Sequence, residues 1–176
     1  MGNRWDHVQA VAAQAARISH VLPEPERAHL VAAAWLHDIG YGPAVRVTGF
    51  HPLDGARYLA TAGIDGDIVS LVAYHSGARY EAEERNLAEQ LATIDPPADA
   101  ALLDALTYAD MTTGPQGQLV AAADRIAEIL SRYGPDDPVH RAVTRSRADL
   151  LAAVKRTEDR LAAVEDSPEV GRRAVL

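Results

Sequence analysis

Apolar residues recur at helical spacing through most of this 176-residue chain, and this period limits its fold more than any other feature. In the first such stretch, one stripe of a helix would carry Val8, Val11, Ala12, Ala15 and Ile18. Alanine and leucine, which favour helices, are abundant, and runs that alternate apolar with polar residues are few. The sequence therefore predicts an all-α fold.

Proline and glycine divide the chain into predicted helices. Pro23 and Pro25 end the first helix, and Gly40 suits a left-handed cap at the end of the second. Pro52 suits the first turn of a third helix, after a loop over residues 42–50. We expect helices over about residues 4–21, 26–39, 52–63, 67–75, 82–92, 98–111, 119–133 and 138–164.

The length is near the common size of a single domain. We expect one domain over residues 1–165 and a flexible tail over residues 166–176. The chain contains no cysteine, which excludes thiolate zinc sites, iron–sulfur clusters and disulfides, and fits a reducing compartment. The first residues lack the apolar core of a signal peptide, and no stretch approaches the roughly 20 apolar residues that span a bilayer. These features predict a cytoplasmic protein with no membrane partner.

The formal net charge of -8 argues against a general nucleic-acid binder, because such binding rests largely on Lys and Arg side chains that neutralise phosphates. A small phosphorylated substrate is compatible with an acidic chain, because bound divalent cations supply positive charge locally. The long charged helix predicted over residues 138–164 is interpreted as a solvated face or as the contact surface of a homodimer.

The doublet His37-Asp38 stands at the end of an alanine-rich apolar run, where a solvated charge pair is not expected. A neutral imidazole and a carboxylate are good ligands for a divalent ion, and burial of an ionised Asp is costly unless a cation compensates it. The doublet therefore predicts a metal site. Further candidate ligands, at predicted helix ends or interiors, are His7, His51, His75 and Asp110. Four His and two Asp suit iron, manganese, zinc, cobalt or nickel better than calcium.

The order of these six residues, over about residues 5–133, resembles the HD domain superfamily of metal-dependent phosphohydrolases. The local sequence His51-Pro52, followed by Gly55-Ala56, is similar to the H-P-x-x-G-A segment of members with extra histidines. Those members include the HD-GYP phosphodiesterases and small dinucleoside polyphosphate hydrolases. The resemblance implies an HD-type helical bundle of about seven to eight helices.

The resemblance also implies a binuclear site with two divalent ions per chain. One ion would be held by His7, His37, Asp38 and Asp110, and the second by His51 and His75, with Asp38 bridging both. A hydroxide between the ions would then attack phosphorus in a small phosphoester, such as a nucleotide or another phosphodiester or pyrophosphate compound.

Two positive side chains are candidates to hold phosphate oxygens, because Arg suits bidentate phosphate contacts. Arg46 lies in the loop after the doublet, and Arg79 lies just after His75. The alternative for both is a solvated side chain. Many HD enzymes have a Lys one or two residues after the doublet, where this chain has Ile39-Gly40-Tyr41. Tyr41 would donate a hydrogen bond in that space or merely pack. The predicted catalytic residues are Asp38, Arg46 and Arg79.

Two other classes of function stay open. Some proteins that resemble HD domains hold two irons with these residue types and oxidise a small organic substrate with dioxygen. A third class binds a ligand or metal without turnover. Two further acidic residues, Asp54 and Asp104, are expected to be solvated or to form local caps, although Asp54 is close enough to His51 to reach the second ion.

Overall fold

The computed structural model describes residues 2–166, and within them the chain forms helices and no strand, so the all-α prediction is confirmed. The α-helices are α1 (Gly2–Ile18), α2 (Glu26–Leu36), α3 (His51–Thr61), α4 (Gly66–Tyr74), α5 (Ala78–Glu84), α6 (Ala88–Leu91), α7 (Ala100–Met111), α8 (Ala122–Arg132) and α9 (Pro138–Glu165). Short 3₁₀ helices follow α1, α2 and α4, namely η1 (Ser19–Val21), η2 (Ile39–Tyr41) and η3 (His75–Gly77). The predicted tail lies outside the described residues, except for residue 166.

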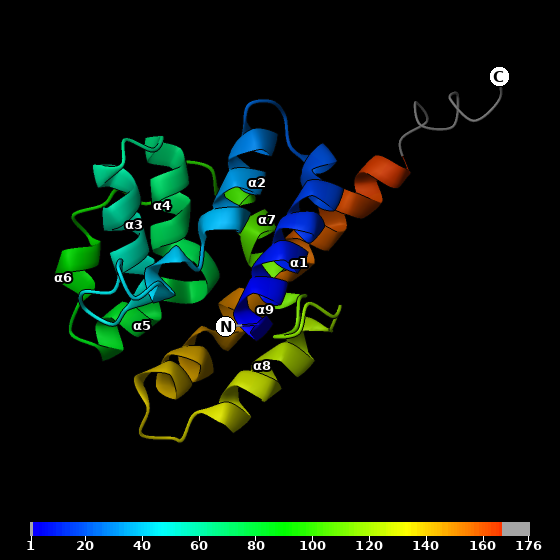
Figure 1. Ribbon diagram of the computed structural model, residues 1–176. Helices are drawn as coiled ribbons and strands as arrows, with labels where there is room; N and C mark the ends of the chain where they lie inside the picture. Colours follow the sequence, from blue (N-terminus) through cyan, green and yellow to red (C-terminus); the bar gives the residue numbers. More distant parts are fainter. Residues whose placement is uncertain (1, 167–176) are drawn as a thin grey trace.

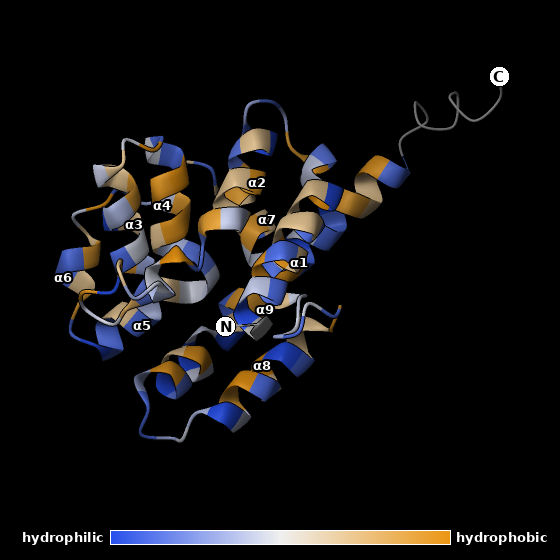
Figure 2. Ribbon diagram, in the orientation of Figure 1, coloured by the Kyte–Doolittle hydropathy of each residue, from blue (hydrophilic) through white to orange (hydrophobic). Residues whose placement is uncertain are grey.

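The helices form two groups that α9 joins. Helices α3 to α6 gather on one side of the molecule, and α1, α2 and α7 occupy the middle (Figure 1). The long α9 contacts α5, α7 and α8. Figure 2 shows an apolar strip beside a hydrophilic one along helices such as α8, as expected for helices that bury one face. No described helix combines the length and the apolar character needed to cross a membrane.

Buried apolar side chains fall into three clusters. One lies between α1, α2 and α7 and includes Leu30 and Leu106. The second lies between α3, α4 and α5 and includes Phe50. The third lies between α7, α8 and α9 and includes Ile126 and Leu150. Full burial of one such side chain contributes roughly 1.5–3 kcal/mol to folding. The three clusters together hold the helix ends that carry the candidate ligands.

The segment after α2 differs from the prediction, which placed the helix end at residue 39 and a left-handed cap at Gly40. The helix ends at Leu36, and Gly40 lies inside η2 and is not among the residues with positive φ. A Cβ atom at Gly40 would lie 2.0 Å from the backbone oxygen of His51 and 2.7 Å from the backbone nitrogen of Gly55. Gly40 is therefore needed for the close approach of η2 to α3, which brings Asp38 beside His51.

Two other predicted helices differ in their bounds. The helix predicted over residues 82–92 is divided into α5 and α6, because Asn86 between them has a φ of 57°. Asn tolerates this left-handed conformation better than most residues. The helix predicted over residues 119–133 begins at Ala122, since Leu119 instead forms an isolated bridge with Thr113.

Candidate metal centre

The structure brings all six predicted ligands into one place. His7 lies in α1, and Asp110 is the residue before the last in α7. The others lie at helix ends: the doublet follows α2, His51 begins α3, and His75 follows α4. Side chains at helix ends can converge because the chain changes direction there, so five segments that are distant in sequence meet at one site.

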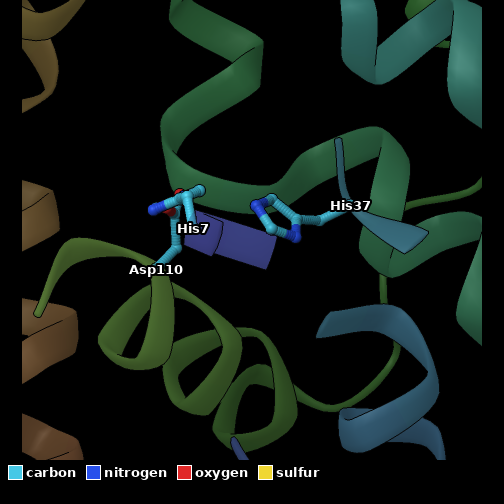
Figure 3. Close-up of side chains that lie close together, drawn as sticks. All are labelled: His7, His37 and Asp110. Carbon is cyan, nitrogen blue, oxygen red and sulfur yellow. The ribbon is translucent and has the colours of Figure 1, made fainter. Parts of the chain in front are cut away.

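The ligand atoms form two groups of three. Within each group, one ligand atom per residue lies within 4.8 Å of the other two; the first group is His7, His37 and Asp110, and the second is Asp38, His51 and His75. Figure 3 shows the first group, with the His37 ring directed toward His7 and Asp110. The Oδ1 atom of Asp38 lies 3.7 Å from Nε2 of His37 and 3.5 Å from Nε2 of His51. Asp38 therefore faces both groups.

Backbone carbonyls contact three of the four histidines in the two groups. Nδ1 of His7 lies 3.1 Å from the oxygen of Gly114, and the other two contacts are shorter. Nδ1 of His37 lies 2.7 Å from the oxygen of Ala34, and Nδ1 of His75 lies 2.7 Å from the oxygen of Val72. A carbonyl only accepts hydrogen bonds, so each Nδ1 carries the proton and each Nε2 presents a lone pair. This is the usual second partner of a histidine that ligates a metal.

The lone pair of His37 has nothing to bind in the described part of the chain. Its Nε2 atom is buried and has no hydrogen-bond partner there. Leaving a buried polar atom in this state costs roughly 1–3 kcal/mol. A cation placed between His37, His7 and Asp110 would bind this lone pair. The unpaired nitrogen is thus explained by a metal ligand better than by a histidine that only packs in the core.

The second group shows the same chemistry. Nε2 of His51 lies 3.2 Å from Nε2 of His75. Burial lowers the pKa of both imidazoles, so both rings are neutral at neutral pH, the form that binds metals. Since Nδ1 of His75 holds the proton of that ring, its Nε2 directs a lone pair at His51. With the carboxylate of Asp38 beside them, the two nitrogens form a set that suits a divalent transition ion.

Asp110 and Asp38 remain ionised despite their burial. Burial would raise the pKa of Asp110, but the hydrogen bond from His7 and the adjacent His37 ring hold it well below its usual value. Burial likewise opposes ionisation of Asp38, yet the His37 and His51 rings and the Arg4 guanidinium lower its pKa to about 2. Both carboxylates are therefore available as charged ligands.

Ser76 supports Asp110 from η3. It has a φ of 47° and a ψ of 40°, a left-handed conformation that costs a non-glycine residue roughly 1–2 kcal/mol. In this conformation the Ser76 hydroxyl donates a hydrogen bond to Oδ2 of Asp110. The strain and the hydrogen bond occur together at the centre, which is typical of functional sites. No sequence pattern described above includes Ser76.

Arg4 and Tyr41 cover the other side of the centre. Nη1 of Arg4 lies 2.8 Å from Oδ2 of Asp38, and the Arg4 guanidinium lies 3.4 Å above the centroid of the Tyr41 ring. Tyr41 in turn stacks on His51, with 4.1 Å between ring centroids. Arg4 precedes His7 by one helical turn, so the i, i+3 spacing in α1 is the signal that could have identified it.

A cavity of about 360 Å³ adjoins both groups of ligands. The polar residues that line it include members of the two groups together with Arg4, Tyr41 and Ser76. Apolar side chains from the end of α7, from α8 and from α9 also line it, namely Met111, Ile129, Val139, Val143 and Leu150. Arg125 and Arg132, both on α8, add positive charge.

Arg46 and Arg79 are exposed and are not among the residues that line this cavity. Arg79 donates hydrogen bonds to the Asp149 carboxylate at 2.8 Å and to the Tyr80 hydroxyl at 2.9 Å. The arginines that line the cavity are therefore not the two predicted from the sequence. The contact that holds Arg79 could not be predicted from neighbouring residues, because Asp149 is 70 residues away in the chain.

The expectation that Asp54 and Asp104 are solvated or form local caps needs correction. Asp54 is buried and accepts hydrogen bonds from the backbone N–H groups of residues 47–49, so it holds the loop before α3. Asp104 is buried and paired with Arg156 and Arg160 of α9. Neither carboxylate belongs to the two groups of candidate ligands.

Comparison with known proteins shows the family of the chain. The family model of the HD domain matches residues 4–153, which is most of the chain and includes all six candidate ligands. Searches of the curated proteins and of the solved structures gave no match. Because the family model covers most of the chain, the chain belongs to the HD domain family, a family of metal-dependent hydrolases.

Proposed function

We propose that this protein is a phosphohydrolase that cleaves a small phosphoester at a centre of two divalent metal ions. His7, His37 and Asp110 would hold the first ion and His51 and His75 the second, and Asp38 faces both groups. The observation that carries the proposal is the pair of three-residue groups beside a cavity, together with the buried Nε2 atom of His37, which has no hydrogen-bond partner among the described residues.

Two ions bound in this way would activate a water molecule and stabilise the attacking and leaving oxygens of a displacement at phosphorus. The residues of the chain supply orientation and charge. Backbone carbonyls hold the rings of His37 and His75, and the Ser76 hydroxyl holds Asp110. This second layer keeps the ligand atoms in place before any ion binds.

Arg4 is the proposed phosphate-binding residue. Its guanidinium is held between Asp38 and the Tyr41 ring, and its side chain is 49% exposed, so N–H donors remain for a substrate oxygen. It would supply the positive charge for which many HD enzymes use a Lys after the doublet. Burial raises the pKa of the Tyr41 hydroxyl, which therefore stays protonated and able to donate a hydrogen bond.

The test is metal analysis joined to an activity assay. The full chain, purified without chelator, is expected to contain about two metal ions and to hydrolyse at least one member of a panel of nucleotides, cyclic nucleotides and simple phosphate esters. His51→Asn removes one ligand and is expected to lower both the metal content and the activity. His20→Asn is the matched control, because His20 is exposed and lies outside both groups.

A folded, metal-loaded protein that hydrolyses nothing in the panel would contradict the proposal. Iron as the bound metal, together with oxygen uptake that depends on an added organic substrate, would support the oxygenase alternative instead. Metal binding without either reaction would support a binding module.

A further inference from the structure

His51 differs from the other three candidate histidine ligands in how its ring is held. The Nδ1 atoms of the other three lie 2.7–3.1 Å from backbone carbonyl oxygens. Among the described residues, the His51 ring makes polar contacts only through Nε2, which lies 3.2 Å from Nε2 of His75 and 3.5 Å from Oδ1 of Asp38. Nε2 is the atom that would bind an ion, so it cannot also serve as the outer contact that orients the ring.

The position of His51 in its helix explains this difference. His37 and His75 each follow the last residue of a helix, where the carbonyl three residues earlier has no N–H partner within the helix. His51 is instead the first residue of α3. The N-terminal end of a helix presents N–H groups rather than free carbonyls, so the His51 ring is oriented by another kind of contact.

The ring of Tyr41 supplies that contact. It stacks on the His51 ring, with 4.1 Å between the centroids and 16° between the planes. The Arg4 guanidinium lies 3.4 Å from the same tyrosine centroid, so the two groups can only occupy opposite faces of the ring. Tyr41 is thus held between Arg4 and His51. The stack limits rotation of the imidazole, because rotation would drive the edge of the imidazole into the tyrosine ring.

The stack depends on the local sequence and is not a result of core packing. Tyr41 ends η2, and Gly40 directly before it permits the close approach of η2 to the backbone of His51. The side chains next to this contact then meet ring to ring. Tyr41 is 40% exposed and belongs to none of the three hydrophobic clusters, so its position serves His51 rather than the core.

We propose that Tyr41 is a positioning residue, whose ring holds His51 in place as a backbone carbonyl does for each of the other three histidines. This inference rests on the proposed function, because it concerns the second ion of the centre. The ring and not the hydroxyl has this role, since the ring alone forms the stack. Binding of an ion by Asp38, His51 and His75 therefore depends on Tyr41, whereas binding by the first group of ligands does not.

Two variants separate the ring of Tyr41 from its hydroxyl. Tyr41→Phe keeps the stacked ring and loses only the hydroxyl, whereas Tyr41→Leu removes the stack. Tyr58→Leu is the matched control, because Tyr58 is a 46% exposed tyrosine on α3, the helix of His51, and does not line the cavity. The exposure of both tyrosines makes unfolding unlikely to follow from these changes, and thermal unfolding checks that each variant is folded.

The first arm of the test measures metal binding without turnover. Cobalt(II) alone is titrated into the chelator-treated full chain by calorimetry, and the binding step that disappears in His51→Asn marks the ion held by His51. We expect Tyr41→Leu to weaken that step about tenfold and to leave the other step within about twofold. Tyr41→Phe and Tyr58→Leu should leave both steps within about twofold. Unchanged binding in Tyr41→Leu, equal weakening of its two steps, or the same weakening in Tyr41→Phe would overturn the role of the ring.

The second arm needs no metal. Crystal structures of the metal-free unaltered chain and of Tyr41→Phe are expected to keep Nε2 of His51 beside Nε2 of His75. In Tyr41→Leu we expect the His51 ring to be displaced by more than about 0.5 Å, the tolerance of a functional site. An undisplaced ring in Tyr41→Leu would overturn the inference. If the unaltered chain binds fewer than two cobalt ions, the proposed two-ion function fails, and the crystal structures decide by themselves whether Tyr41 positions His51.

Discussion

Helix α7 carries two buried carboxylates whose surroundings differ. Asp104 accepts hydrogen bonds from Arg156 at 2.8 and 2.6 Å and from Arg160 at 3.2 Å. Asp110 instead faces the His7 ring at 3.1 Å and the Ser76 hydroxyl. The charge of Asp104 is thus compensated by two permanent cations of α9, whereas Asp110 depends on groups that carry no permanent charge.

This difference separates a carboxylate that stabilises the fold from one that is available to a ligand. Arginine stays protonated at any ordinary pH, so the contacts of Asp104 are complete without any added ion. The ring of His7, unlike an arginine side chain, carries no permanent charge. Burial lowers its pKa, but the Asp110 carboxylate outweighs this effect and raises the pKa above the usual value. A divalent ion would compensate Asp110 more fully than a histidine can.

The largest expected effect comes from removing the charge of Asp110. Asp110→Asn replaces a carboxylate ligand by a weakly ligating amide, and we expect the activity to fall by more than about 100-fold and the metal content to decrease, because loss of even an outer partner costs about 10–100-fold. Metal analysis and kcat/KM measure both. Asp104→Asn is the control on the same helix and should keep the metal content. Equal metal loss in the two variants would refute the distinction.

The next effect concerns the stability of the Asp104 contact. Removing both cations, in the double variant Arg156→Met and Arg160→Met, leaves Asp104 buried without compensation and is expected to destabilise the protein by about 3 kcal/mol. Asp104→Asn should cost less, about 1 kcal/mol, because the arginines it leaves behind are 54% and 32% exposed and can be hydrated. Urea unfolding measures both. A larger loss of stability in Asp104→Asn than in the double variant would contradict this, because it would show that the arginines depend on the ion pair more than Asp104 does.

Ser76 allows a sharper test of Asp110. Ser76→Ala removes the hydroxyl that orients this carboxylate, and we expect metal affinity or activity to fall about tenfold. Ser76→Gly removes the same hydroxyl but accepts the left-handed conformation, so it should be more stable than Ser76→Ala by about 1 kcal/mol. Thermal unfolding and metal titration separate the two contributions. If Ser76→Ala keeps full metal affinity, Ser76 has only a structural role.

The smallest expected effect on stability concerns Asp54. Its carboxylate is buried like those of Asp104 and Asp110, but its hydrogen bonds come mainly from the backbone. The backbone N–H groups of residues 47–49 and the Thr48 hydroxyl overcome the effect of burial and lower its pKa. A lowered pKa stabilises the folded state above the unfolded value of 3.8, and this contribution disappears as the pH falls through the folded pKa. Asp54→Asn should therefore lose about 1 kcal/mol at neutral pH and less near pH 3. A destabilisation that does not change with pH would assign the effect to packing.

Much of the fold could be predicted because helical periodicity and proline positions are local properties. The predicted ranges for α1, α3 and α9 agree with the structure to within a few residues. Two of the errors arose where a contact outside the helix sets the backbone. Gly40 takes its conformation from the approach of His51 and Gly55, and Leu119 takes its own from a bridge to Thr113.

The site divides in the same way. The six candidate ligands were recognisable because their order and neighbours carry a family pattern, and the structure places them together. The positive groups of the cavity were not recognisable by that route. Arg79 is bound to Asp149, whereas Arg125 reaches the cavity from α8, and nothing near either residue in the sequence distinguishes them.

The sequence by itself determined the helices, the family and the set of candidate metal ligands, since these depend on residue type and spacing along one chain. Only the tertiary structure decided how the ligands divide into two groups, which buried carboxylates are already compensated, and which arginines face the cavity. The physical reason is that burial and charge pairing are properties of neighbours in space. The two carboxylates of α7 show this directly, because the arginines of α9 reach Asp104 and do not reach Asp110.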